Sequence, residues 1–311
     1  MSAPSAAELV LGSVQLGLPY GAANRTGQPS RTQALRLVHR AIDAGITAFD
    51  TARAYGESED RLGEALSGQK TVHTVTKLSP LSELAPDAPR QIVRAAVDAS
   101  IAESLAALQR DHLDCLLLHR AAHITSHGGA IWERLIERLE DGTVLALGVS
   151  VQSPAEALAA LDCHDVVHIQ MPFNLLDKRW REAGVIDKIK ARPHVTIHAR
   201  SVFLQGILAA NDPSVWPVVP GVDAPALVDL IAELTRAFER KSPADLCLAY
   251  ARGQRWIDGV VVGMETTDQL ETNLSLFMRP PLSPEDCAII EARVLALPAA
   301  LLDPAQWPKK P

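Results

Sequence analysis

Short apolar runs alternate with longer segments of helical periodicity along almost the whole chain, and this alternation limits the possible folds more than any other feature. Eight runs rich in leucine or β-branched residues occupy residues 9–15, 48–51, 72–78, 113–119, 146–150, 166–170, 195–201 and 259–263. Between the runs, apolar residues recur at three- and four-residue spacing, as in Ala34, Leu35, Val38, Ala41 and Ile42. Strands that alternate with helices in this way pair in parallel. The pattern therefore predicts an α/β fold with eight parallel strands.

Eight strand–helix units in 311 residues fit a (β/α)8 TIM barrel, with residues 1–311 forming a single domain. A doubly wound open sheet is the alternative, but no G-x-G-x-x-G turn follows the first strand, as nucleotide-binding sheets of that kind require. No linker divides the chain, although the proline-rich segment 213–225 is expected to form an irregular loop after the seventh strand. A closed barrel is the predicted fold.

Helix-start signals mark the second half of the chain. Ser153 is followed by Pro154 and Glu156, the pattern of a capping box with proline at the first helical position. Ser242 and Ser283 are also followed by proline. Helices are therefore expected to begin at these three serines.

Composition excludes several classes of protein. Hydrophobic residues make up 47% of the chain and charged residues 22%, which is enough apolar surface for a packed core. Thirty basic against thirty-seven acidic residues give a net charge of −7, so no nucleic-acid partner is expected. No apolar run is long enough to span a bilayer, residues 1–17 lack a basic signal region, and the four cysteines form no CxxC pair. We therefore expect a cytoplasmic protein with reduced thiols and no membrane partner.

Titratable side chains follow three neighbouring runs. Asp50 ends the second run with Tyr55 just beyond it, Lys77 lies at the end of the third, and His119 ends the fourth. In a parallel barrel, the carboxyl ends of the strands meet at one face, which is where catalytic residues gather. An unpaired charge at a buried rim is costly, so Asp50 is the expected partner of Lys77. The four side chains are predicted to form one site.

The segment from Phe49 to Gly56, which reads FDTARAYG, resembles the signature of the aldo-keto reductases, and the resemblance extends over nearly the whole chain. It implies a (β/α)8 barrel that binds NADPH at the carboxyl face of the strands and reduces an aldehyde or ketone. It also places Asp50, Tyr55, Lys77 and His119 at the four catalytic positions of that family. The substrate implied is a small carbonyl compound.

The chemistry of these groups fits that assignment. A free phenol has a pKa of about 10, so a nearby ammonium is needed to stabilise the phenolate left after proton donation. Tyr55 would then be the proton donor, Lys77 its stabilising cation, and Asp50 the group that holds Lys77, while His119 orients the carbonyl. Two alternatives remain open: a cofactor-sensing barrel that regulates a partner protein, and a Schiff-base aldolase with Lys77 as nucleophile.

The resemblance also implies residues that bind the nicotinamide half of the cofactor. Ser150 and Gln170 match the positions that grip the carboxamide, although Val151 stands where the family usually has asparagine. Arg200 occupies the position of a tyrosine that stacks on the nicotinamide, and a guanidinium plane can also lie against a ring. Ser201 and Gly206 complete this expected set.

The adenine half is expected near the last strand. The residues assigned to it are Gly263, Met264, Thr266, Gln269 and Asn273. Thr266 to Gln269 read as a capping box whose free N–H groups suit a phosphate.

The loop before that helix bears on the choice of cofactor. It carries Glu265 and Asp268 rather than the basic residues that favour a 2′-phosphate. NADPH is the cofactor expected from the family, NADH is the alternative, and the NADPH preference is predicted to be weak.

Substrate contacts are expected from two loops. Tyr20 and Asn24 follow the first strand, and His123 and Trp132 follow the fourth. Histidine pairs with HxxxH spacing do not fall on a helix with a third ligand, so no metal site is expected. The sequence does not indicate the oligomeric state.

Overall fold

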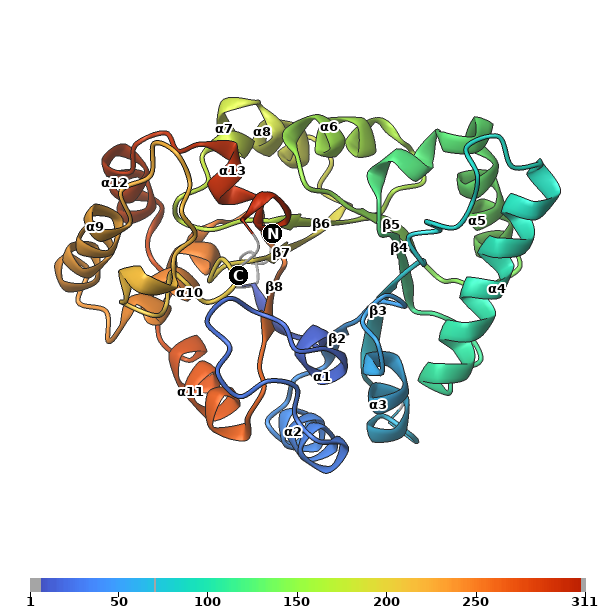
Figure 1. The fold of residues 1–311 in the computed structure, drawn as a ribbon, viewed down its shortest axis with the longest axis horizontal. Helices are drawn as coiled ribbons and strands as arrows, with labels where there is room; N and C mark the ends of the chain where they lie inside the picture. Colours follow the sequence, from blue (N-terminus) through green and yellow to red (C-terminus); the bar gives the residue numbers. More distant parts are fainter. Residues whose placement is uncertain (1–6, 70, 309–311) are drawn as a thin grey trace.

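The computed structural model describes residues 7–69 and 71–308. Its eight strands are parallel and form a closed barrel in chain order, with β8 paired to β1 (Figure 1). The strands are β1 (Glu8–Gly12), β2 (Ala48–Asp50), β3 (His73–Lys77), β4 (Cys115–Leu118), β5 (Leu147–Ser150), β6 (His168–Pro172), β7 (Thr196–Arg200) and β8 (Gly259–Gly263). The predicted (β/α)8 fold is confirmed.

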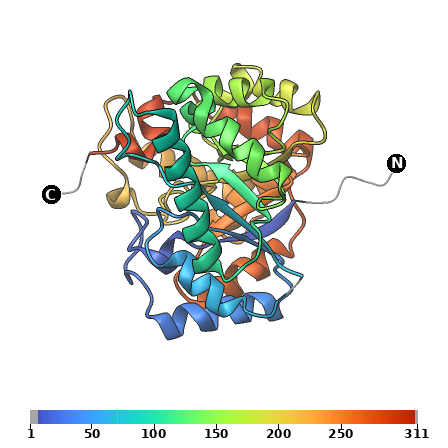
Figure 2. The ribbon, with the colours of Figure 1, turned by 90° about the vertical axis from the view of Figure 1, so that its right-hand side faces the viewer.

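Helices surround the barrel, and Figure 2 shows α4 and α5 packed side by side along its outer face. The α-helices are α1 (Val14–Gly17), α2 (Arg31–Asp43), α3 (Ser58–Ala65), α4 (Arg90–Leu108), α5 (Ala130–Glu140), α6 (Pro154–Asp162), α7 (Arg179–Glu182), α8 (Val185–Lys190), α9 (Ala224–Ala237), α10 (Pro243–Gly253), α11 (Thr267–Phe277), α12 (Pro284–Arg293) and α13 (Ala299–Leu302). The 3₁₀ helices are η1 (Ala121–Ile124), η2 (Ser126–Gly129), η3 (Pro213–Val215) and η4 (Pro304–Gln306). In the part of the chain that is described, no helix is both long and apolar enough to cross a membrane.

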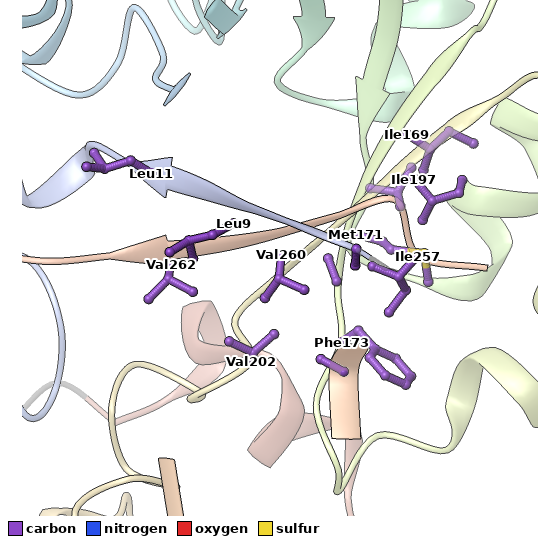
Figure 3. Close-up of a cluster of buried hydrophobic side chains, with 14 of the residues drawn as sticks. Leu9, Leu11, Ile169, Met171, Phe173, Ile197, Val202, Ile257, Val260 and Val262 are labelled. Atoms are coloured by element: carbon purple, nitrogen blue, oxygen red, sulfur yellow. The ribbon is translucent and has the colours of Figure 1, made fainter. Parts of the chain in front are cut away.

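Side-chain alternation divides each strand between two environments. Leu9 and Leu11 of β1 belong to the large apolar cluster between strands and helices, together with residues of β6, β7 and β8 (Figure 3). Val10, between them in sequence, instead packs with Ala48 and Val261 in a separate cluster. Because successive residues of a strand point to opposite faces, the first cluster fixes the helices and the second fills the barrel interior.

The predicted helix starts are confirmed. Ser153 and Ser283 form complete capping boxes, and Ser242 accepts a hydrogen bond from the backbone N–H of Asp245. The expected loop over residues 213–225 is too long, because α9 begins at Ala224. Asp223 caps that helix, and a proline in the first turn costs no intrahelical hydrogen bond.

The strand ends differ slightly from the apolar runs. The first run extends past Gly12 because Ser13 begins the turn into the short helix α1. The fourth run includes His119, which lies one residue beyond the end of β4. Both differences place polar residues just after the strands, on the face where the candidate site lies.

Candidate active site

A cavity of about 1050 Å³ opens at the carboxyl ends of the strands. The last residues of five strands line it: Gly12, Asp50, Ser150, Arg200 and Gly263. Tyr55 and His119, from the loops after β2 and β4, line it as well. Ligand pockets of proteins commonly measure about 300–1,000 Å³, so this cavity has room for a large ligand.

A buried ion pair lies at the base of this cavity. The ammonium of Lys77 donates hydrogen bonds to both carboxylate oxygens of Asp50, at 2.9 and 2.7 Å, and to the carbonyl oxygen of Thr51 at 2.8 Å. The side chains of Lys77 and Asp50 are only 1% and 5% exposed. Burial is the largest single influence and lowers the pKa of Lys77, but the Asp50 carboxylate and Tyr55 together outweigh it, so the pKa is raised. Lys77 is therefore a cation whose three N–H groups are all engaged.

Tyr55 and His119 lie beside the ion pair. The ammonium of Lys77 is 5.1 Å from the centre of the Tyr55 ring. The ring centres of Tyr55 and His119 are 5.9 Å apart, with the rings perpendicular. The structure thus brings together the four side chains that the sequence analysis grouped.

The imidazole of His119 is neutral at neutral pH. Burial lowers its pKa to about 4, and the positive charges of Lys77, Arg200 and Arg120 contribute to the shift. Its Nδ1 atom is buried and has no hydrogen-bond partner within the described structure. A neutral imidazole keeps one N–H donor, which suits it to hydrogen-bond a carbonyl oxygen.

Gln170 lies inside the barrel and does not line the cavity. Its Nε2 atom donates a 2.6 Å hydrogen bond to Asp50, while its Oε1 atom is buried and unpaired in the described structure. Asp50 thus receives hydrogen bonds from both Lys77 and Gln170. In this arrangement Gln170 orients the Asp50 carboxylate, and its side chain is fully buried.

The other residues assigned to the cofactor fall into two groups. Those that line the cavity are Ser150, Arg200, Ser201, Gly206, Gly263, Gln269 and Asn273. Met264 and Thr266 do not line it: Met264 is fully buried, and Thr266 caps α11. The cap is not the reciprocal box that the sequence predicts, because Gln269 Oε1 accepts from the N–H of Glu265 rather than from that of Thr266.

The loop after β7 has an unusual backbone. Ser201, Leu204, Gln205 and Gly206 all have positive φ values, between 45° and 91°. Residues other than glycine rarely adopt this conformation. Ser201, Gln205 and Gly206 line the cavity, so the strained segment forms part of its wall.

Arg200 is tied to the loop after β5. Its Nη2 atom donates to the carbonyl oxygen of Val151 at 3.2 Å and to Oε1 of Gln152 at 2.8 Å. Sequence reasoning missed Gln152, although it lies just two residues after Ser150. It also missed Arg120, which directly follows His119 and lines the cavity.

Only two of the four residues expected to contact substrate line the cavity. Tyr20 and Asn24 line the cavity, and Gln205 hydrogen-bonds the hydroxyl of Tyr20. His123 and Trp132 do not line it and are only 7% and 8% exposed. Over residues 7–69 and 71–308, no group of three metal-ligating side chains is found.

Comparison with known proteins places this geometry in a family. The model of the aldo/keto reductase family matches residues 8–294. The chain belongs to the aldo/keto reductase family. Membership implies a nicotinamide cofactor. The volume of the cavity and the polar residues along its walls suit such a ligand.

Curated aldo/keto reductases align mainly over part of their length. A 6-dehydroglucose reductase of Novosphingobium aromaticivorans is 34% identical over 140 residues, which cover 40% of this chain and 44% of that protein. A methylglyoxal reductase of Escherichia coli is 27% identical over 48% of this chain and 50% of its own. The chain thus spans about half the length of these relatives. An uncharacterized oxidoreductase of Bacillus subtilis, 22% identical, aligns over 84% of this chain and 88% of its own.

Solved aldo/keto reductase structures share the fold. The holo form of a Bacillus halodurans enzyme superimposes with a TM-score of 0.75 at 22% identity, covering 94% of this chain and 93% of that one. Its apo form gives a TM-score of 0.69 over 92% of each chain.

Proposed function

We propose that this aldo/keto reductase reduces a small aldehyde or ketone to an alcohol with a nicotinamide cofactor. The observation that carries the proposal is the buried Asp50–Lys77 pair beside Tyr55 and His119 at the base of a large cavity. Reduction needs a hydride and a proton, and a bound reduced nicotinamide would supply the hydride. The residues of the chain supply the proton and the charge stabilisation.

Tyr55 donates the proton to the carbonyl oxygen. The ammonium of Lys77, which Asp50 keeps charged, stabilises the phenolate that remains. The neutral imidazole of His119 hydrogen-bonds the carbonyl oxygen and orients it toward the donor. Gln170 donates a hydrogen bond to the same Asp50 oxygen as Lys77 does, which helps to fix the carboxylate.

The cofactor is proposed to lie along the wall formed by the ends of β5, β7 and β8. Ser150 and Gly263 line this wall, and Gly206 belongs to the strained loop that completes it. Beyond Gly263, the first N–H groups of α11 are available for a phosphate.

A Schiff-base aldolase fits the site poorly. Its lysine nucleophile must be a neutral amine, whereas Asp50 raises the pKa of Lys77 against the effect of burial, and all three N–H groups are engaged. The comparisons support neither this alternative nor a cofactor-sensing regulator.

Oxidation of NADPH, followed at 340 nm with a panel of aldehydes and ketones, tests the proposal. We expect one NADPH to be consumed for each alcohol formed, as measured by chromatography of the product. Bound NADPH that no carbonyl compound oxidises would favour a sensing role instead.

We propose NADPH as the cofactor and expect only a weak preference for it over NADH. Glu265 and Asp268 line the cavity near α11, and among the described residues Arg120 and Arg200 are the only arginine or lysine side chains along its wall. Acidic side chains repel a 2′-phosphate. Fluorescence titration should give Kd values that differ by less than about a thousandfold, and a larger difference would contradict the proposal. Asp268→Asn should tighten NADPH more than NADH, whereas Asp229→Asn on the exposed face of α9 should change neither.

A further inference from the structure

One end of the cavity is positively charged, and the candidate chemistry leaves this charge unexplained. Arg120 and Arg200 both line the wall near His119. Their positive charges act on the imidazole, where they add to the effect of burial on the pKa of His119. Both arginines therefore line the same cavity as His119, the residue proposed to orient the carbonyl.

Neutral acceptors hold Arg200 in place. Besides Val151 and Gln152, its guanidinium contacts the hydroxyl of Ser201, at 3.4 Å. Gln152 is fixed in turn, because its Nε2 atom donates to Asp303 at 3.1 Å. Arg200 thus has a defined orientation, but no carboxylate of the described residues forms an ion pair with it.

Several other poorly exposed arginines of this protein are paired with acids. Arg53 lies 2.5 Å from Glu59, Arg134 lies 2.6 Å from Asp98, and Arg179 lies 2.7 Å from Asp177. Arg110, Arg192 and Arg252 instead bind backbone carbonyl oxygens. Arg200 differs from these three because it lines the cavity.

A cation in a partly dehydrated wall is stabilised when an anion approaches it, because solvent screens their attraction less there than in bulk water. Arg200 lacks such a partner within the described chain. Arg120, which is exposed, forms no ion pair there either and donates a hydrogen bond to Ser82.

None of the acidic residues along the cavity forms an ion pair with Arg200 or Arg120 in the described structure. Asp50 is paired with Lys77, and Glu156 accepts hydrogen bonds from the backbone N–H groups of Gln152 and Ser153. Glu265 and Asp268 belong to the segment at the start of α11, after β8.

We propose that Arg200 and Arg120 form an anion site for the substrate, which is a carbonyl compound that also carries a carboxylate. This inference rests on the proposed function and deepens it. Both arginines line the same cavity as His119, so the carboxylate and the carbonyl would belong to one substrate molecule bound there. A guanidinium binds a carboxylate through two parallel hydrogen bonds, which also fixes the direction of the substrate. Arg200 then contacts substrate instead of replacing the nicotinamide-stacking tyrosine.

Matched aldehydes test the anion site. The substrate pairs are 4-carboxybenzaldehyde with its methyl ester, and succinic semialdehyde with butanal. Wild-type protein should give the higher kcat/KM for the charged member of each pair, and added salt should reduce this preference. Arg200→Met should lower kcat/KM at least tenfold more for the charged than for the uncharged aldehyde. Arg200→Lys should recover part of that difference.

Control variants keep the test independent of folding. Arg36→Met removes an exposed arginine of α2 and should leave the preference unchanged. Arg120→Met should reduce the preference in the same direction as Arg200→Met, so the proposal remains testable if the Arg200 variant fails to fold.

The outcomes separate this inference from the proposed function. Equal losses for the charged and uncharged aldehydes, or wild-type protein without any preference, would overturn the anion site and leave carbonyl reduction in place. Phosphate groups of the cofactor are the other anion that Arg200 could hold. A Kd for NADPH that rises more than tenfold in Arg200→Met, with the substrate preference intact, would assign Arg200 to the cofactor. Failure of wild-type protein to reduce any aldehyde would overturn both proposals.

Discussion

Asp50 and Lys77 show how single residues in this barrel depend on each other. Both are buried, and each supplies the charge that makes burial of the other tolerable. Such a pair contributes little net stability compared with apolar residues of the same volume, so its position beneath the cavity points to a chemical role. Gln170 completes the arrangement by donating to the same carboxylate.

Asp50→Asn should destabilise the protein by about 3–5 kcal/mol, because it leaves the Lys77 ammonium buried without its counter-charge. Urea denaturation gives this free energy of unfolding. The double variant Asp50→Asn with Lys77→Met should recover much of the loss. A single variant within about 1 kcal/mol of wild type would show that the pair is not buried as described.

Individual residues could be located from the sequence where they follow a strand. Asp50, Lys77 and His119 were found in this way, because parallel strands end at a common face. The partners of Arg200 could not be found, because the side chain of Gln152, in the loop after β5, reaches the end of β7 through a hydrogen bond that spacing in sequence does not reveal. His123 shows the opposite error: its loop position suggested a substrate contact, but the 3₁₀ turn η1 buries it away from the cavity.

Helices α3 and α4 pack closely together at Gly63. Gly63 of α3 lies against the end of α4, where a Cβ atom at this position would meet the carbonyl oxygen of Ala107 at 2.1 Å. Backbone atoms of Leu108 would lie within 3 Å. Because α3 follows the loop that carries Tyr55, this contact also fixes the chain beside the candidate site.

Gly63→Ala should therefore destabilise the protein by about 1–3 kcal/mol, although alanine favours a helix more than glycine does. The obstructing atoms belong to the backbone and cannot rotate away. Thermal or urea unfolding measures the effect, and Gln91→Ala on the exposed face of α4 provides the control. A more stable Gly63→Ala variant would mean that α3 and α4 are further apart.

Helix starts were predictable where capping residues agreed with the alternation of strands and helices along the chain. The capping box at Ser153 appears in the sequence and in the structure. The start of α9 was missed, because prolines that resemble a loop in sequence also suit the first turn of a helix. Thr266 caps α11 as predicted. The reciprocal hydrogen bond of a capping box depends on the direction of the Gln269 side chain, which the spacing of residues does not determine.

Across the whole molecule, the barrel interior is unusual in containing two buried imidazoles. His168 and His198 meet with ring centres 4.2 Å apart. Burial lowers the pKa of His198 to about 4 and that of His168 well below its ordinary value. The closed barrel therefore holds both rings in the neutral form.

This burial predicts a loss of stability in acid. Between pH 6.5 and about pH 4, the unfolded chain binds a proton at His198 that the folded chain does not, so the free energy of unfolding falls as the pH falls. The pKa difference corresponds to roughly 3 kcal/mol for this residue. Denaturation of wild type and His198→Leu at several pH values measures the effect. The variant should lose less stability between pH 6.5 and 4.5, and parallel curves would contradict the prediction.

The fold as a whole was the most predictable level, because eight strand–helix repeats and the chain length agree on one architecture. The size of the cavity and the charge at its end were not predictable, since they depend on where side chains from distant loops meet. Arg120 and Arg200 are 80 positions apart in sequence and lie on the same wall.

Proton donation by Tyr55 is the central claim, and the Tyr55→Phe variant tests it most directly. The measurement compares NADPH oxidation by wild type and variant with an aldehyde that wild type reduces, together with the Kd of NADPH for each. We expect kcat/KM to fall at least about a hundredfold, because general acid catalysis typically contributes about 10²–10⁴. The Kd of NADPH should change less than twofold. A variant that binds NADPH and keeps more than about a tenth of the wild-type kcat/KM would contradict the account.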